Sequence, residues 1–98
     1  MASSLKNLSE YSQKNLTDIS QKRFAIVVAE WNEEVTGALL NGAIATLQKE
    51  GALEKNIEVK TVPGSYELSL GAQWMAHRAN IDAVICLGCI IQGETRHF

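Results

Sequence analysis

The stretch Phe24–Ala29 reads FAIVVA, which is apolar at every position and partly β-branched. Such an unbroken run is typical of a strand buried on both faces, as in a parallel sheet. Asn32 follows shortly afterwards and is a residue type that caps helices, and Glu33 and Glu34 suit a first helical turn. The sequence therefore predicts a buried strand that leads directly into a helix.

Beyond this point the apolar residues repeat at helical spacing. Val35, Leu39, Ala43 and Leu47 recur every fourth position, which predicts that they form one apolar face. Gly51 is a plausible end for this helix, because glycine tolerates the left-handed backbone that often follows a last turn.

A strand, a helix and a strand complete the pattern. Residues 57–62 (IEVKTV) alternate as in a strand, and Pro63-Gly64 ends it. The expected second helix carries an apolar face of Leu68, Ala72, Met75 and Ala79. Residues 83–87 (AVICL) form the expected third strand. Alternating strands and helices imply parallel pairing through right-handed crossovers. With the first strand in the middle, the expected fold is flavodoxin-like, a three-layer α/β/α arrangement on a narrow and incomplete sheet.

Composition excludes several classes of protein. The chain has 98 residues, of which 46% are hydrophobic and 20% charged, with a net charge of −2. A dedicated nucleic-acid-binding protein would normally carry a basic excess. No apolar run approaches the roughly 20 residues of a membrane span, and residues 1–22 form a polar arm without the pattern of a secretory signal or transit peptide. These features favour a cytoplasmic location.

Unusual residues gather in the three segments that leave the carboxyl ends of the strands, namely Glu30–Asn32, Pro63–Glu67 and Gly88–His97. Open α/β sheets bind ligands at this edge. The segments offer a flat ring, hydroxyls, a carboxylate, backbone amides beside glycines and an imidazole. This combination suits a small, planar, polar ligand that also carries an anion.

Each residue also has a purely structural interpretation. Trp31 could pack at the end of its strand, and Ser65 could cap the second helix. Glu67 could serve only as a first-turn charge. Gly93 could mark an ordinary turn, and His97 could be a surface residue instead of a proton-transfer group.

Cys86 and Cys89 have the CxxC spacing, but a redox or metal role is the less favoured interpretation. A four-cysteine zinc site would need a second pair, and none is present. Cys86 lies within the third predicted strand and is expected to pack in the core. Cys89 is expected in the loop that follows.

Three stretches together resemble the lumazine synthase family: RFAIVVAEWNEEVT from Arg23, VPGSYELSL from Val62 and DAVICLGCIIQGETRHF from Asp82. Their order and spacing match that family without an obvious gap. The resemblance covers about the first two-thirds of a family member and implies that residues 23–98 form the N-terminal part of a single α/β domain. The family's fourth strand and remaining helices lie outside it.

The resemblance implies an enzyme that condenses 5-amino-6-(D-ribitylamino)uracil with 3,4-dihydroxy-2-butanone 4-phosphate. The product is 6,7-dimethyl-8-ribityllumazine, the precursor of riboflavin, and phosphate and water leave. The resemblance implies no metal or organic cofactor. It also implies a homo-oligomer, a pentamer that can assemble into a capsid of sixty subunits, with neither nucleic acid nor membrane as partner.

The same resemblance assigns roles to individual residues. The positions assigned to the ribitylaminouracil are Trp31, Asn32, Ser65, Tyr66, Glu67, Cys89, Ile90 and Ile91. Those assigned to the butanone phosphate are Gly93, Glu94 and Thr95, and the general acid/base is His97. Gln92 departs from the family, since relatives commonly carry a basic residue there. Two alternatives remain: a non-catalytic fragment or assembly module of this family, and a flavodoxin-like module that binds flavin or nucleotide.

Overall fold

Strand β1 (Phe24–Ala29) lies at the centre of a parallel sheet with the order β2-β1-β3. The computed structural model describes residues 17–78 and 80–94. In it, Phe24 pairs with Ile57 at the start of β2 (Ile57–Val62) and with Ala83 at the start of β3 (Ala83–Leu87). The residues from Ala25 to Ala29 are all buried. The predicted burial of this strand on both faces is therefore confirmed.

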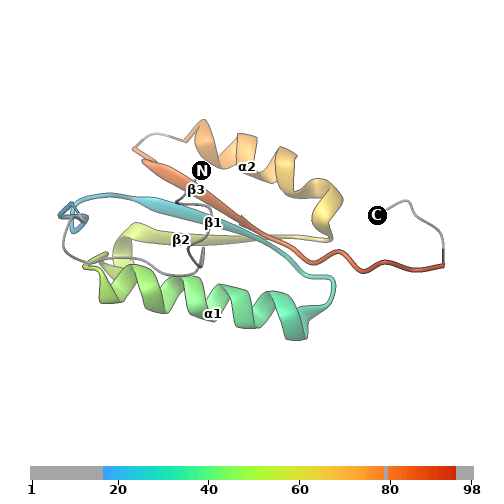
Figure 1. Ribbon diagram of the computed structural model, residues 1–98. Coiled ribbons are helices and arrows are strands. Elements are labelled where there is room, and N and C mark those ends of the chain that lie inside the picture. Colours follow the sequence, from blue (N-terminus) through green and yellow to red (C-terminus); the bar gives the residue numbers. More distant parts are fainter. Residues whose placement is uncertain (1–16, 79, 95–98) are drawn as a thin grey trace, which may run out of the picture.

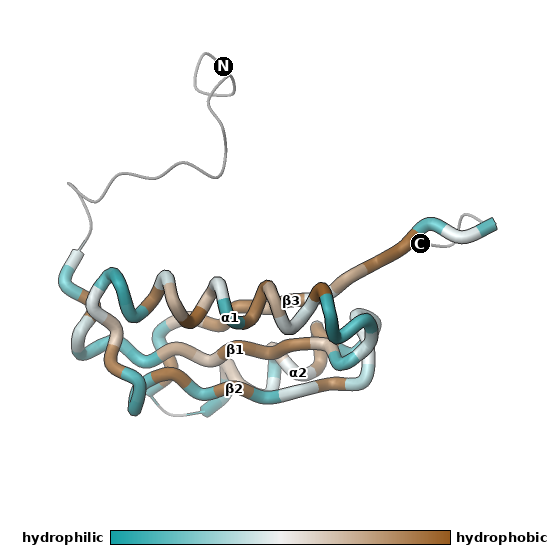
Figure 2. Tube along the Cα trace, turned by 90° about the horizontal axis from the view of Figure 1, so that it is seen from below, coloured by the Kyte–Doolittle hydropathy of each residue, from teal (hydrophilic) through white to brown (hydrophobic). Residues whose placement is uncertain are grey.

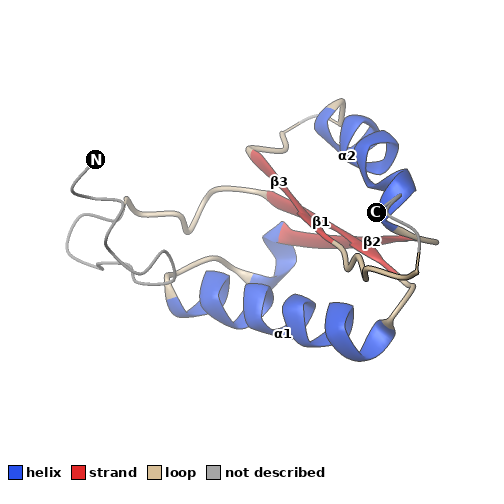
Figure 3. Ribbon diagram, turned by 45° about the vertical axis from the view of Figure 1, so that its right-hand side comes forward, coloured by secondary structure: helices blue, strands red, loops and turns tan. Residues whose placement is uncertain are grey.

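Two helices cover opposite faces of the sheet (Figures 1 and 3). Helix α1 (Glu33–Lys49) follows β1, and helix α2 (Leu68–Ala76) follows β2. Short 3₁₀ turns, η3 (Glu54–Asn56) and η4 (Ser65–Glu67), precede β2 and α2. This is the predicted flavodoxin-like arrangement, with β1 in the middle and the two crossovers running in opposite directions.

The sequence prediction was wrong about which face of α1 meets the sheet. Val35 and Leu39 are 41% and 43% exposed, whereas Thr36 is buried. Ala43 and Leu47, later in the same series, are half-buried. A helix has 3.6 residues per turn, so a series spaced by four drifts around the axis by about 40° at each step. Over three steps the series spans too wide an arc to lie on one face.

Helix α2 packs closely on the other face of the sheet. Met75 is buried and forms a core cluster with Ala25 and Val27, against which Leu68 packs. Gly71 is also buried, and a β-carbon there would lie 2.8 Å from Cγ1 of Val27. The predicted core positions Leu68 and Met75 are therefore confirmed, Ala72 is half-buried, and Ala79 lies outside the described residues.

The prediction that Cys86 packs in the core was wrong, because Cys86 is exposed. Cys86 is paired with the fully buried Val27, and residues in register on parallel strands face the same side. However, β3 lies at one side of the sheet that the described residues form, so among these residues its side chains have a neighbouring strand on one side only. The tube in Figure 2 shows that the hydrophobic character of β3 continues into the segment that leaves it.

The described part of the polar arm, residues 17–22, lies near the end of α1. Ile19 lines a shallow cavity together with Thr46 and Leu47. The Ser20 backbone N–H donates to the carboxylate of Asp18 at 2.9 Å, and this bond lowers the pKa of Asp18. Residues 1–16, including Leu16, lie outside the described residues.

The end of α1 follows the prediction. Gly51 has a φ of 110°, a backbone conformation that favours glycine, and it comes directly after the helix cap at Glu50.

Within residues 17–78 and 80–94, neither helix has the length and apolar character needed to cross a bilayer.

Candidate active site at the carboxyl edge of the sheet

The loops that leave β1 and β2 are joined by backbone hydrogen bonds beyond the last paired residues. The N–H of Glu30 donates to the carbonyl of Val62 at 2.8 Å, and the N–H of Trp31 donates to the carbonyl of Pro63 at 3.0 Å. The segment after β3 leaves the sheet at the same end (Figure 1). The predicted convergence of the three segments at one edge is thus present.

Large side chains stand exposed along this edge. Trp31 is 52% exposed, Tyr66 93%, Ile90 63% and Ile91 58%. The main chain of Trp31 is held by its hydrogen bond to Pro63, while its ring keeps accessible surface. A ring in this position can present a face to a planar ligand, in addition to packing at the end of its strand.

Asn32 occupies the cap position of α1, but it does not cap the helix with its side chain. Its backbone is left-handed, with φ 59° and ψ 59°, and its carbonyl oxygen accepts from the N–H groups of Val35 and Thr36 at 3.0 Å. Its amide nitrogen, Nδ2, donates to Sγ of Cys89 at 3.3 Å. The prediction of Asn32 as a side-chain cap was therefore wrong, because its backbone is left-handed and not extended as in a capping residue, and its side chain donates to another loop.

Ser65 does not cap the second helix with its side chain either. Its hydroxyl donates to the carbonyl oxygen of Cys89 at 3.2 Å, and Gly64 precedes the 3₁₀ turn as its cap. Cys89 consequently accepts one hydrogen bond through its thiol and another through its main chain. It links the segment after β3 to both of the other loops.

Glu67 stabilises the turn in which it lies. Its Oε1 accepts from the backbone N–H of Gly64 at 2.8 Å. This bond holds the carboxylate beside the β2–α2 loop, and the side chain is only half-buried. A carboxylate accepts more than one hydrogen bond, so Glu67 retains capacity for hydroxyl groups of a ligand.

The segment predicted to hold an anion is only partly described. Gly88–Gly93 has no regular secondary structure, a bend occurs at Glu94, and a β-carbon on Gly93 would meet nothing within 4 Å. The backbone therefore has open space around Gly93 for a ligand to approach. Thr95 and His97, to which the sequence assigned phosphate binding and proton transfer, lie outside the described residues.

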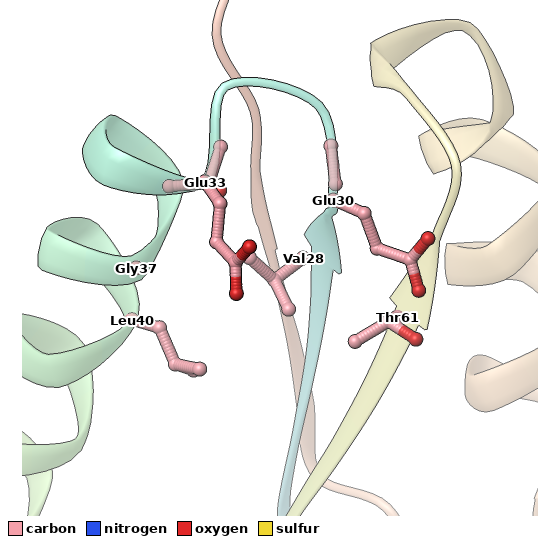
Figure 4. Close-up of a pocket in the computed structure, with 8 residues that line it drawn as sticks. Val28, Glu30, Glu33, Gly37, Leu40 and Thr61 are labelled. Carbon is pink, nitrogen blue, oxygen red and sulfur yellow. The ribbon is translucent and has the colours of Figure 1, made fainter.

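A neighbouring cavity of about 370 Å³ lies between α1 and the sheet (Figure 4). In the close-up, Glu33 and Leu40 come from α1, while Glu30 and Thr61 come from the strand side. The residues that line it are Val28, Ala29, Glu30, Glu33, Thr36, Gly37, Leu40 and Thr61. Glu30 belongs to one of the three segments at the carboxyl edge, but none of the eight is among the residues assigned to a substrate.

Sequence reasoning missed two residues that build the site. Thr36 is buried and its hydroxyl donates to the carbonyl of Asn32 at 3.3 Å. Gly88 lies where a β-carbon would come within 2.6 Å of the Ser65 hydroxyl. A glycine immediately after an apolar strand was the available signal, because glycine permits close approach of two segments. Among the described residues, no three His, Cys, Asp or Glu side chains come together as potential metal ligands.

These features define a parallel α/β protein with a candidate site at the carboxyl edge of the sheet, where the strand order reverses. Residues 21–98 match the family model of 6,7-dimethyl-8-ribityllumazine synthase. The chain therefore belongs to that family.

Individual relatives carry the same name. Over all 98 residues, the chain is 57% identical to a 6,7-dimethyl-8-ribityllumazine synthase of Cytophaga hutchinsonii and covers 61% of that protein. It is 59% identical over 76 residues to one of Bacteroides fragilis, which involves 78% of this chain and 53% of the relative. It is 41% identical over all 98 residues to one of Porphyromonas gingivalis, and it covers 61% of that relative. The chain thus spans between about half and three-fifths of the length of these relatives.

Proposed function

We propose that this chain forms the N-terminal part of a lumazine synthase. The reaction would join 5-amino-6-(D-ribitylamino)uracil to 3,4-dihydroxy-2-butanone 4-phosphate, forming 6,7-dimethyl-8-ribityllumazine and releasing phosphate and water. The observation that carries the proposal is the linkage of three loops at one edge of the sheet, with the Trp31 ring exposed there. Membership of the family supports the same reaction.

The described residues fit a planar substrate with a polyol chain. Trp31 would stack on the pyrimidine ring, with Asn32 beside it, and Glu67 would accept hydrogen bonds from the ribityl hydroxyls. Ser65 and Tyr66 adjoin Glu67 on the same loop and would contact the same substrate. The main chain at Cys89, Ile90 and Ile91 would bind the edge of the uracil.

The second substrate would bind further along the same segment. Gly93, Glu94 and Thr95 would hold the phosphate through backbone N–H groups and the threonine hydroxyl. His97 would transfer protons during imine formation and loss of phosphate. Binding the two substrates side by side would itself accelerate the condensation, since orientation removes much of the entropic cost of a bimolecular reaction. The proposed reaction takes place in the cytoplasm.

The direct test is to incubate the natural full-length protein with both substrates and to follow the fluorescence of the lumazine product. We expect product to accumulate in proportion to enzyme, faster than in matched mixtures without protein. A folded preparation that binds the aminouracil without forming product would instead support the non-catalytic module. Tight flavin binding without condensation would support the general flavodoxin-like alternative.

We also propose that the protein acts as a homo-oligomer, with the pentamer as its basic unit. Exposed apolar side chains on both helices support association: Val35 and Leu39 on α1, and Leu70 and Trp74 on α2. Native mass spectrometry of the full-length protein should give masses at multiples of five subunits. A monomer that persists at micromolar concentration would contradict this assembly.

A further inference from the structure

Asn32 adopts a conformation that its surroundings must maintain. Its φ and ψ of 59° lie in the left-handed region, which asparagine enters more readily than most residues but still at a cost. Its carbonyl oxygen is held by three donors from the first turn of α1, namely the N–H groups of Val35 and Thr36 and the hydroxyl of Thr36. The main chain of Asn32 is therefore anchored to the helix.

The side chain of Asn32 is anchored elsewhere. Its amide donates to the thiol sulfur of Cys89 across 57 positions of sequence. This distance of 3.3 Å is suitable for a sulfur acceptor, and both residues are half-buried. Because the Cys89 carbonyl also accepts from Ser65, the thiol belongs to a residue whose main chain is itself held in place.

Trp31 lies immediately before Asn32 and is therefore held from two directions. On its N-terminal side, its own N–H donates to Pro63. On its C-terminal side, the Asn32–Cys89 hydrogen bond holds the next residue. The main chain at Trp31 and Asn32 is therefore tied to both of the other loops, while the Trp31 side chain stays exposed.

We propose that the Cys89 side chain is a positioning residue: its thiol binds the Asn32 amide and thereby orients Trp31 for stacking on the aminouracil. This inference rests on the proposed function. It gives the side chain a role separate from the one proposed above for the Cys89 main chain. The thiol touches no substrate atom in this role and acts through Asn32.

The first experiment needs no ligand and reports on Trp31 alone. In the full-length protein, Trp74→Phe removes the other tryptophan of residues 1–98, and any further tryptophan beyond them is replaced in the same way. Cys89→Ala should then increase acrylamide quenching and lower the fluorescence anisotropy of Trp31. Cys89→Ser returns an acceptor and should restore part of both signals. Cys86→Ala is the matched control, because the Cys86 thiol takes no part in the hydrogen bond from Asn32, and it should change neither signal.

The second experiment measures substrate binding. Cys89→Ala should raise the Kd of 5-amino-6-(D-ribitylamino)uracil about five-fold, as loss of one ordinary hydrogen bond would, while kcat at saturation changes less than about two-fold. Asn32→Gly retains the left-handed backbone but lacks the donor, and it should raise Kd at least as much, because Asn32 is itself assigned to the substrate. The double variant should bind no more weakly than Asn32→Gly alone, since Cys89→Ala then removes a bond that is already lost.

The outcomes separate this inference from the proposed function. If Cys89→Ala leaves Trp31 quenching and anisotropy unchanged in a folded protein, the positioning role is overturned whatever the enzyme does. Additive effects of Cys89→Ala and Asn32→Gly on Kd would also overturn it. If the unaltered protein binds no aminouracil, the proposed function fails, while the Trp31 signals still decide the role of the thiol.

Discussion

A β-carbon added to Gly88 would lie 2.6 Å from the hydroxyl oxygen of Ser65. That hydroxyl donates to the carbonyl of Cys89, the residue after Gly88. The same β-carbon would lie 2.7 Å from Cδ1 of Leu68, at the start of α2. The absence of a side chain at Gly88 is therefore what allows the β2–α2 loop to approach the segment after β3.

Gly88→Ala should consequently destabilise the protein and disturb the site together. We expect a loss of about 1–3 kcal/mol in the free energy of unfolding, as for other overpacked positions, and weaker binding of the aminouracil. Gly42→Ala, in open space on α1, is the control and should stabilise by about 0.5–1 kcal/mol through helix propensity. Denaturant unfolding measures the stability of both variants, and equal stabilities would contradict the close approach at Gly88.

Gly71→Ala should disturb the packing of α2 against the sheet. Its β-carbon would meet Cγ1 of Val27 at 2.8 Å and Cγ1 of Val62 at 3.0 Å. We expect the free energy of unfolding to fall by about 1–3 kcal/mol. Because Val27→Ala removes one of the clashing groups, the double variant should lose less than the sum of the two single variants. Simple additivity in thermal unfolding would show that the clash is absent.

Trp31→Ala should weaken binding more than it weakens the fold. The ring is 52% exposed, and base–aromatic stacking contributes about 1–3 kcal/mol, so we expect the Kd of the aminouracil to rise by about five-fold to 150-fold. Trp31→Phe should retain most of the affinity. Trp74→Phe, which keeps an apolar ring on α2, is the control for loss of a tryptophan elsewhere and should leave Kd unchanged. Isothermal titration calorimetry makes the comparison, and equal affinity in Trp31→Ala would exclude stacking.

Substitutions of Glu67 should separate its two roles. Glu67→Gln retains an oxygen that can accept from the Gly64 N–H but loses the charge, so the fold should persist while the ribityl hydroxyls bind less tightly. A hydrogen bond to a charged group contributes about 1.5–3 kcal/mol, which sets the expected loss in binding. Glu67→Ala should lower both thermal stability and affinity. The proposed contact with the ribityl chain would be wrong if Glu67→Gln bound the substrate normally.

His97→Ala tests the proposed proton transfer. General acid–base catalysis typically contributes about 10²–10⁴-fold, and single-turnover condensation should slow within that range. Affinity for the aminouracil, measured separately, should change little. An unchanged single-turnover rate would remove His97 from the mechanism.

Much of the fold could be predicted from local patterns. The uninterrupted apolar run of Phe24–Ala29 indicated burial on both faces, and alternation of strands with helices indicated parallel pairing. The three loops of the site followed from the rule that parallel strands end at one edge. Local patterns did not predict that Val35 and Leu39 would be exposed while Thr36 is buried. That choice depends on how the whole helix lies against the sheet.

The amino-acid sequence by itself determined the order of elements, the central strand and the residues available at the carboxyl edge. These properties depend on near neighbours, such as the β-branched run in β1 or glycine at position 51. Only the tertiary structure decided that Asn32 binds Cys89 instead of capping its helix, and that the Ser65 hydroxyl binds the Cys89 carbonyl. Those outcomes depend on groups far apart in the chain, which come within hydrogen-bonding distance only because the parallel sheet brings their loops to one edge.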